Sequence, residues 1–396
     1  MHSSGGRTFF AHVTSWRFVL TLVCLFGVDG WLETTTIAER ATLGGFDTAR
    51  DFRKPQDGTH TAVVGISGLE TAKYFGGKRP IPAESLAKVV TRLMRLNPRV
   101  LVVDVFTDGA DYRRVQFTDS LVLSEQQRIV WAQSADTANG QMMPVLGGAP
   151  NPPGRTGLAA ILADEDRLVR RFRPRYASSG VRPASELIES LPLAAANAFV
   201  ADGRDSARIT KNVPTDTGSI ALRSYQHNPP YYLLDDVMGA VPTLAQRPDT
   251  AFSNRVLILG FVDGTDQVVT ANGMRSGPQV VADGVETLLD TRRAVRGFPF
   301  LAEWSAKIAL ALLVAFIHFR LPRPAAAASM VVLTALVIGA GFLTFEYFGF
   351  WTNFVLIVVG TWIEQLYESA THAPPRVVVP EPATVALTPP NPLGVE

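Results

Sequence analysis

The sequence is almost without cysteine and carries almost no net charge. Its single cysteine in 396 residues, Cys24, lies inside an apolar run. A disulfide framework is therefore excluded, and any exported domain must be large enough to be stable without one. The formal net charge is +1 at pH 7, which gives no indication of nucleic acid as a partner.

Motifs for catalysis and metal binding are also missing. Residues 65–68 (GISG) lack the final spacing of the Gly-x-Ser-x-Gly nucleophile motif. His60 and His227 are the only histidines between residues 33 and 302, and no cysteine in that range could complete a zinc site with them. We therefore predict no cofactor, no metal site and no enzymatic activity.

Long apolar runs occur only near the two ends of the chain. Three of them follow one another at residues 304–319, 329–345 and 350–366. Each is close to the ~20 residues that a helix needs to cross a bilayer, where only helical hydrogen bonding satisfies the backbone. We predict three transmembrane helices within residues 303–366. The alternative is a buried helical core of a soluble protein.

The charges of the connecting loops orient these helices. Arg320 and Arg323 lie between the first two runs, whereas the next loop carries only Glu346. Positively charged loops stay in the cytoplasm. The residues before the first run are therefore predicted to lie outside, and the proline-rich tail, residues 367–396, to be disordered and cytoplasmic.

The amino-terminal apolar run has two interpretations. Residues 1–15 form a short cytoplasmic segment in our interpretation, because Arg7 and Arg17 are present near this end without an acidic residue. Residues 16–32 are either a cleaved signal peptide or an uncleaved anchor. We favour a transmembrane anchor because no small-x-small cleavage site follows. Both interpretations place residues 33–302 outside the cytoplasm.

Residues 33–302 alternate short apolar runs with helical patterns. Strands are predicted at residues 62–66, 100–103, 128–133 and 255–260, and helices at residues 83–96, 183–202 (interrupted at Pro192) and 279–291. This alternation predicts one α/β domain with a largely parallel sheet covered on both faces. The predicted fold class is this extracytoplasmic domain plus one amino-terminal and three carboxy-terminal transmembrane helices.

Five motifs follow one another along this domain: Phe46-Asp47, Pro80-Ile81-Pro82, residues 102–106 (VVDVF), residues 164–171 (DEDRLVRR), and residues 256–260 (VLILG) with Asp266 after them. They resemble, in order, the CHASE type-2 (CHASE2) sensory domain of bacterial receptors. That family typically has one transmembrane helix before the domain and three after it. Its members commonly carry a cytoplasmic output domain, for which residues 367–396 are too few. The resemblance therefore implies a stand-alone sensor.

Four residues are candidates for ligand binding. Asp104 ends a central parallel strand and Asp108 follows it, at the edge where open α/β sheets bind ligands. Capping of a helix, or pairing with an arginine, is the alternative for Asp104. Asp166 belongs to an acidic segment that could hold a cation, although the arginines that follow favour internal ion pairs. Ser67, just after the first strand, completes the set.

We interpret the chain as a multi-pass protein of the inner cell membrane with a periplasmic sensory domain. An unknown ligand would bind outside, and the helices would convey the state to an unknown signalling or complex partner protein. The expected partners are thus the lipid bilayer, that protein and that ligand, with no nucleic acid. The alternatives are a structural subunit of a membrane complex and, with less support, an exported membrane-anchored hydrolase.

Overall fold

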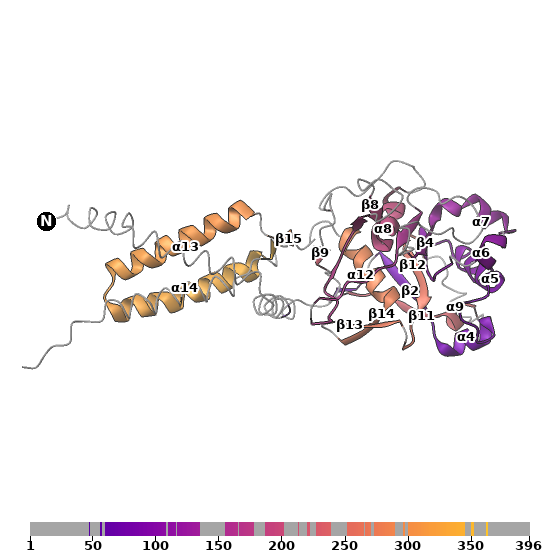
Figure 1. Ribbon diagram of the computed structural model, residues 1–396, viewed down its shortest axis with the longest axis horizontal. Coiled ribbons are helices and arrows are strands. Elements are labelled where there is room, and N and C mark those ends of the chain that lie inside the picture. Colours follow the sequence, from indigo (N-terminus) through magenta and orange to yellow (C-terminus); the bar gives the residue numbers. More distant parts are fainter. Residues whose placement is uncertain are drawn as a thin grey trace, which may run out of the picture.

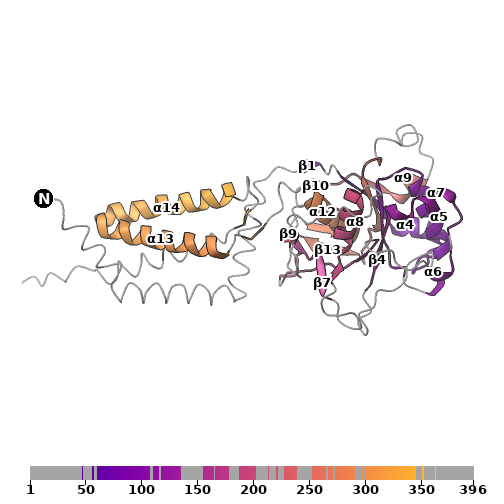
Figure 2. The same cartoon turned by 90° about the horizontal axis from the view of Figure 1, so that it is seen from above.

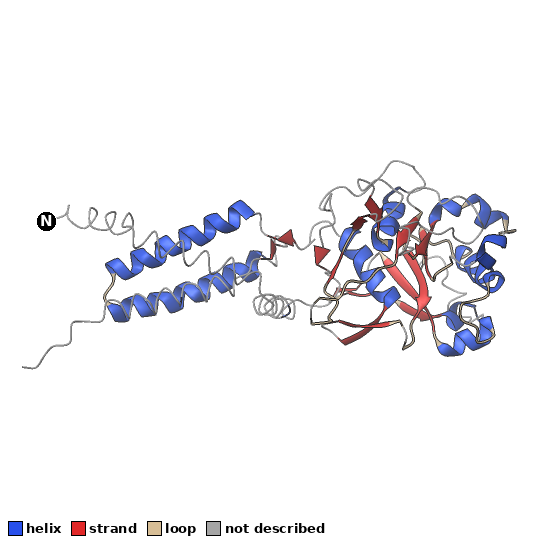
Figure 3. Ribbon diagram, in the orientation of Figure 1, coloured by secondary structure: helices blue, strands red, loops and turns tan. Residues whose placement is uncertain are grey.

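A six-stranded sheet lies at the centre of the α/β domain in the computed structural model (Figures 1 and 3). Its order is β11 (Tyr231–Leu233), β2 (Thr61–Ile66), β12 (Val256–Phe261), β3 (Val100–Asp104), β4 (Ile129–Gln133) and β5 (Thr156–Leu158). Every neighbouring pair is parallel. The predicted α/β class with a largely parallel sheet is confirmed, and the two short edge strands β5 and β11 are additions to the prediction.

The structure describes residues 47, 56–57, 60–107, 110–115, 117–134, 155–164, 166–177, 187–201, 213, 220–221, 227–238, 252–264, 266–270, 273–289, 296–297, 300–344, 350–351 and 362. The predicted amino-terminal transmembrane segment, most of the third carboxy-terminal run, the tail and Asp108 lie outside these residues.

The strand in the middle of the sheet comes from late in the sequence. β12 pairs with β2 on one side and with β3 on the other, so that Ile258 lies between Val63 and Val102. Residues 256–259 are fully buried. A strand with apolar side chains on both faces is fully buried when it lies inside a sheet that is covered on both sides. The predicted strands 62–66 and 100–103 therefore lie parallel in one sheet and are separated by β12.

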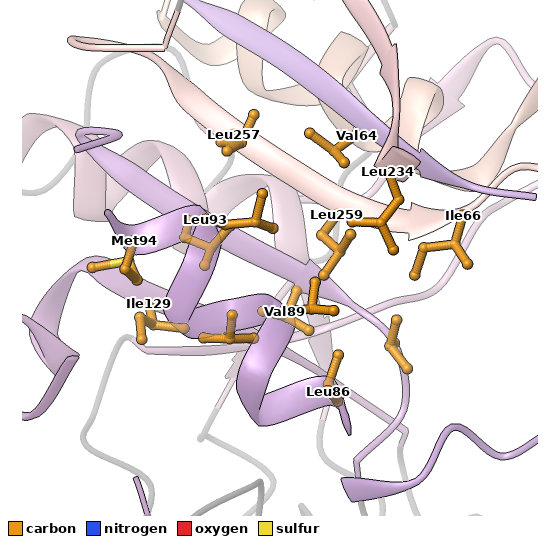
Figure 4. Packing of buried hydrophobic residues seen from close by; sticks show 14 of the residues in the cluster. Val64, Ile66, Leu86, Val89, Leu93, Met94, Ile129, Leu234, Leu257 and Leu259 are labelled. Atoms are coloured by element: carbon orange, nitrogen blue, oxygen red, sulfur yellow. The ribbon is translucent and has the colours of Figure 1, made fainter. Parts of the chain in front are cut away.

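Alternating side chains of the strands enter two hydrophobic cores. Leu101 and Val103 face the layer that contains α4 (Gly68–Phe75) and α5 (Ala83–Met94), while Val100 and Val102 face α8 (Leu191–Ala201) and α12 (Gly277–Leu289). Figure 4 shows Leu86, Val89 and Leu93 of α5 packed toward Leu257 and Leu259 of β12. Each such side chain contributes about 1.5–3 kcal/mol on full burial.

The helix α5 follows the pattern that predicted it. Its buried residues recur at helical spacing, which places one apolar face on the sheet. The helix begins after Pro82 and ends at Met94, and Asn97 then takes a left-handed φ of 54°. Asparagine tolerates this conformation, so the chain turns sharply into β3.

The prediction for residues 183–202 is wrong in two respects. Pro192 does not interrupt a helix: it lies in the first turn of α8, where a missing backbone N–H costs little. The residues before it form β8 (Leu187–Glu189), which pairs antiparallel with β7 (Arg175–Ala177). The predicted helix 279–291 is confirmed as α12, two residues earlier at each end.

Shorter elements surround this core. The paired strands are β1 (Gln56–Asp57) with β10 (His227–Asn228), β6 (Arg171–Phe172) with β9 (Ile220–Ala221), β13 (Gln267–Thr270) with β14 (Gly273–Ser276), and β15 (Arg296–Gly297) with β16 (Phe350–Trp351). The short helices are α6 (Ala110–Arg114), α7 (Ser120–Ser124), the 3-10 helix Gln126–Arg128 and α9 (Leu234–Met238).

Two long helices lie side by side away from the sheet (Figures 1 and 2). They are α13 (Phe300–Arg320) and α14 (Arg323–Leu343), and their turn lies at the end farthest from the sheet. The predicted runs 304–319 and 329–345 are thus helical over nearly all their length. Among the described residues, α14 alone is long and apolar enough to cross a membrane, over Pro324–Leu343.

Candidate functional site

A cavity of about 290 Å³ lies at the carboxyl edge of the sheet. The ends of β3, β5 and β12 contribute Asp104, Leu158 and Phe261, and the first turns of α8 and α12 contribute Pro192 and Gly277. Parallel strands bring their carboxyl ends to one edge, and ligands of open α/β sheets bind there. Most of the remaining lining is apolar.

Asp104 is a carboxyl group of this cavity whose negative charge is not paired with a positive charge among the described residues. It ends β3 and is partly exposed, and its side chain has no hydrogen bond or ion pair in the described part of the chain. Burial, and secondarily the charge of Asp266, raises the pKa of Asp104 to about 7. Neither predicted alternative, helix capping or arginine pairing, is seen among the described residues.

Asp266 is the second carboxyl of the cavity. It precedes α12 in the sequence and lies beside the first turn of that helix. Its carbonyl oxygen accepts a hydrogen bond from the Gly277 amide at 2.8 Å. A Cβ at Gly277 would lie 2.7 Å from the Asp266 Oδ2, so a larger residue there would displace this carboxylate. Burial raises the pKa of Asp266 to about 6; the charge of Asp263 adds to the rise and Arg79 opposes it.

Two arginines line the cavity, and each is bound to a carboxylate. Arg79 places its Nη2 2.5 Å from the Asp263 Oδ2, and its guanidinium lies 4.3 Å from the Phe261 ring centroid. The Nη2 of Arg171 lies 2.5 Å from the Asp164 Oδ1. Each of the two arginines at the cavity is therefore paired with a carboxylate. Neither Asp104 nor Asp266 forms an ion pair with another described residue.

The acidic segment 164–166 contributes to a buried ion-pair cluster beside this site. Arg170 is 4% exposed and binds Asp47 at 2.8 Å, Asp164 at 3.3 Å and Asp166 at 2.8 Å. The Arg170 guanidinium holds the pKa of Asp166 below its ordinary value. This is the ion-pair alternative that the sequence favoured. Among the described residues, no group of three or more His, Cys, Asp or Glu side chains could hold a metal ion.

Ser67 starts a helix. Its hydroxyl accepts a hydrogen bond from the Leu69 amide at 3.2 Å, and Glu70 accepts one from the Ser67 amide at 3.0 Å. This reciprocal arrangement is a capping box at the start of α4. Ser67 and Asp166 do not line the cavity, and Asp108 lies outside the described residues. Asp104 is the candidate that the structure places at the cavity.

The cavity also contains residues that were not predicted as site residues. Asp266 is separated from Asp104 by about half of the domain sequence, and β12 brings the two together. A local signal for Asp266 exists in its position, shortly after a buried strand and before the Gly277-Pro278 start of a helix. Nothing local in the sequence indicates that Arg79 would stack on Phe261.

The comparison with family models agrees with this architecture. The model of the CHASE2 domain matches residues 18–319, which include the whole central sheet, the cavity and most of α13. No curated protein and no solved structure matches the chain. The matched span is well over half of the 396 residues. The chain therefore belongs to the CHASE2 domain family, a family of extracytoplasmic sensory domains.

Proposed function

We propose that this protein is a membrane-anchored sensor whose periplasmic domain binds a small ligand in the cavity at the carboxyl edge of the sheet. The observation that carries the proposal is Asp104, a carboxyl without a partner among the described residues, in a mostly apolar cavity. Buried polar groups are normally hydrogen-bonded, so an exception at the ligand-binding edge of an α/β sheet favours a bound partner.

The surface of α14 supports membrane anchoring. Val331, Val332, Leu336 and Leu343 are between 57% and 63% exposed, on a helix that is apolar enough over Pro324–Leu343 to cross a membrane. Such a continuous apolar surface is unfavourable in water and suits lipid. Arg320 and Arg323 at the far turn favour a cytoplasmic position for that turn, which leaves the sheet domain outside.

One contact supports a route from the cavity to the membrane helices. Phe342, near the end of α14, packs against the core that α8 and α12 form with the sheet. The same two helices begin at the cavity, and Figures 1 and 2 show their layer on the side of the sheet nearest the helical pair. A ligand that shifts α8 or α12 would change the packing of Phe342 against this core. A separate membrane or cytoplasmic partner would then respond to the helices.

An exported hydrolase is the second candidate, because two interacting carboxyls with raised pKa values are the arrangement that acid–base hydrolysis uses. The sensory character of the family favours binding over turnover. Turnover of a candidate substrate that is lost in Asp104→Asn would establish the hydrolase instead.

A cavity-filling variant tests the sensor proposal. The full chain in lipid nanodiscs would be screened against a chemically diverse set of small molecules by thermal shift. Ala160, which lines the cavity and is partly exposed, would be changed to tryptophan in one variant and to serine in its control. We expect some compounds to stabilise the wild type and Ala160→Ser but not Ala160→Trp. Compounds that stabilise all three equally, or none of them, would contradict the proposed site.

A further inference from the structure

The charges of the cavity restrict the chemistry of a ligand bound there. Arg79 and Arg171 are matched by Asp263 and Asp164, at 2.5 Å in both pairs. Asp104 and Asp266 have no ion-pair partner within the described residues, although they are close enough for Asp266 to raise the pKa of Asp104. The cavity therefore carries excess negative charge once both carboxyls ionise.

Two features of the cavity disfavour an anion. The helices α8 and α12 begin there, and helix N-termini attract anions through their free amides. However, Pro192 and Pro278 each remove one such amide from the first turn. At α12 the backbone oxygen of Asp266 accepts the Gly277 amide, and its carboxylate lies beside Gly277. An anionic ligand would add negative charge beside this carboxylate.

A divalent metal ion also fits poorly. Calcium and similar hard ions take six or more oxygen ligands, commonly from several carboxylates. In the part of the chain that the structure describes, no group of three or more potential metal-ligating side chains of this kind occurs. Two carboxyls match the hydrogen-bonding demand of one ammonium group better, since an ammonium donates up to three hydrogen bonds.

The walls of the cavity require an apolar body on the same ligand. Leu158, Phe172, Phe261, Val280 and Val281 line it, and among the described lining residues the charged ones are two matched arginines and the two carboxyls. Phe261 already lies under the Arg79 guanidinium, which shows that its ring face accommodates a cation. Burial of an apolar group against these walls is favourable, whereas a small hydrated ion has no apolar surface to bury there.

We infer that the ligand is a small organic amine, whose ammonium group lies between the carboxyls of Asp104 and Asp266 and whose apolar body fills the cavity. This inference rests on the proposed ligand-binding function of the cavity. One consequence follows from linkage: the amine binds the ionised carboxyls, so binding releases protons and the affinity rises with pH from about 5.5 to 8. The other charged groups near the two carboxyls are the pairs Arg79 with Asp263 and Arg171 with Asp164.

Three probes with the same apolar body test the inference on the full chain in nanodiscs: 2-phenylethylamine, 2-phenylethanol and phenylacetate. We expect the amine to bind and the other two to bind at least tenfold more weakly, the size expected for one charged hydrogen bond. Asp104→Asn should weaken amine binding by a similar factor and flatten its pH dependence. Asp235→Asn, which alters an exposed ion pair with Lys73 on α9, should leave both unchanged.

The outcomes separate the two proposals. If the alcohol or the carboxylate binds as tightly as the amine and Ala160→Trp abolishes that binding, the site stands and the amine assignment is overturned. If the amine does not bind, or binds Ala160→Trp equally well, the amine assignment also fails. The site itself then depends on whether another class of compound is blocked by Ala160→Trp. Asp266→Asn provides a second variant if Asp104→Asn does not fold, and unfolding curves without probe establish folding.

Discussion

Two aspartates of the sheet domain show how surroundings decide the role of one residue type. Asp164, with a side chain 4% exposed, lies against Arg170 and Arg171 and is part of a structural cluster. Asp104 ends β3 with no such partner among the described residues, and its pKa rises to about 7. Carboxyls whose pKa is strongly raised, as that of Asp104 is, are found preferentially at functional sites.

The raised pKa of Asp104 predicts a pH-dependent effect on stability. Its ordinary value is 3.8, so between about pH 4 and pH 7 the folded protein holds a proton that the unfolded chain releases. The stability that this proton supplies is complete below pH 4 and is lost as the pH rises to about 7. We expect Asp104→Asn to be close to neutral at pH 4.5 and to stabilise by about 1–4 kcal/mol at pH 8. Urea unfolding of the full chain at both values measures it.

A matched control for this prediction has the opposite sign. The hydrogen bond from Lys73 lowers the pKa of Asp235, so its stabilising effect is present above the ordinary pKa and is lost in acid. Asp235→Asn should therefore destabilise at pH 8 and not at pH 3. An Asp104→Asn effect that is equal at pH 4.5 and pH 8 would contradict the assigned pKa.

Arg170 should be among the least replaceable charged residues of the domain. Its removal leaves the buried Asp164 with Arg171 as its remaining arginine partner, and the contacts with Asp47 and Asp166 are lost as well. We expect Arg170→Met to destabilise the protein by about 3–5 kcal/mol, as for other broken buried pairs. Arg95→Met, which breaks the more exposed pair with Asp119, should cost about 0–1 kcal/mol. Equal effects in urea unfolding would show that the Arg170 cluster is not structurally important.

At the scale of elements, the start of α12 combines packing with the site. Gly260 of β12 has no room for a side chain, because a Cβ there would lie 2.4 Å from the Cγ of Pro278. This close approach sets α12 against the end of β12, where the Gly277 amide donates to the backbone oxygen of Asp266 and the Asp266 carboxylate lies beside the first turn. The geometry of the cavity thus depends on how tightly one strand end and one helix start approach each other.

Gly277→Ala should disturb the cavity from within α12. The new Cβ would lie 2.7 Å from the Asp266 Oδ2, so the carboxylate must move. We expect a stability loss of about 1–3 kcal/mol, as for other overpacked sites, together with weaker binding of any ligand of the cavity. Gly264→Ala is the control, because nothing described lies within 4 Å of its added Cβ. Urea unfolding and thermal shift compare the two, and identical behaviour would contradict the close approach.

At the scale of the whole molecule, the helical pair and the sheet domain lie along one long axis (Figures 1 and 2). The two helices have 21 residues each, or about 30 Å, and among the described helices α14 alone is apolar enough over this length to cross the hydrocarbon layer of a bilayer. The turn between them lies at one end of the molecule and the sheet domain toward the other. A bilayer around the helices would therefore separate the turn from the domain.

This separation predicts which positions a membrane-impermeant maleimide reaches in intact spheroplasts. The background is Cys24→Ser, which removes the only native cysteine. Leu69→Cys, at a position 83% exposed in the sheet domain, should be labelled at once. Leu321→Cys, at the turn and 38% exposed, should be labelled only after permeabilisation. The reverse pattern would place the sheet domain in the cytoplasm and exclude a periplasmic sensor.

The sequence by itself determined the central strands, the helices α5 and α12 and the apolar helices at the end of the described chain. These features depend on hydrophobic periodicity and length, which are local properties. It also placed Asp104 at the carboxyl end of a buried parallel strand, where the structure has it; its role in ligand binding stays a prediction. It wrongly made Pro192 an interruption between helical segments, because the tolerance of a first turn for proline depends on where the helix begins.

Only the tertiary structure decided the order of the strands and the composition of the cavity. The sequence does not show that β12 lies between β2 and β3, since strand order depends on pairing between distant segments. That insertion brings Asp266 and the start of α12 to Asp104. It also decides which charges are matched, because Arg79 meets Asp263 and Arg171 meets Asp164 only in the folded chain. Burial and charge pairing depend on all neighbours at once, and therefore the pKa of Asp104 follows from the fold.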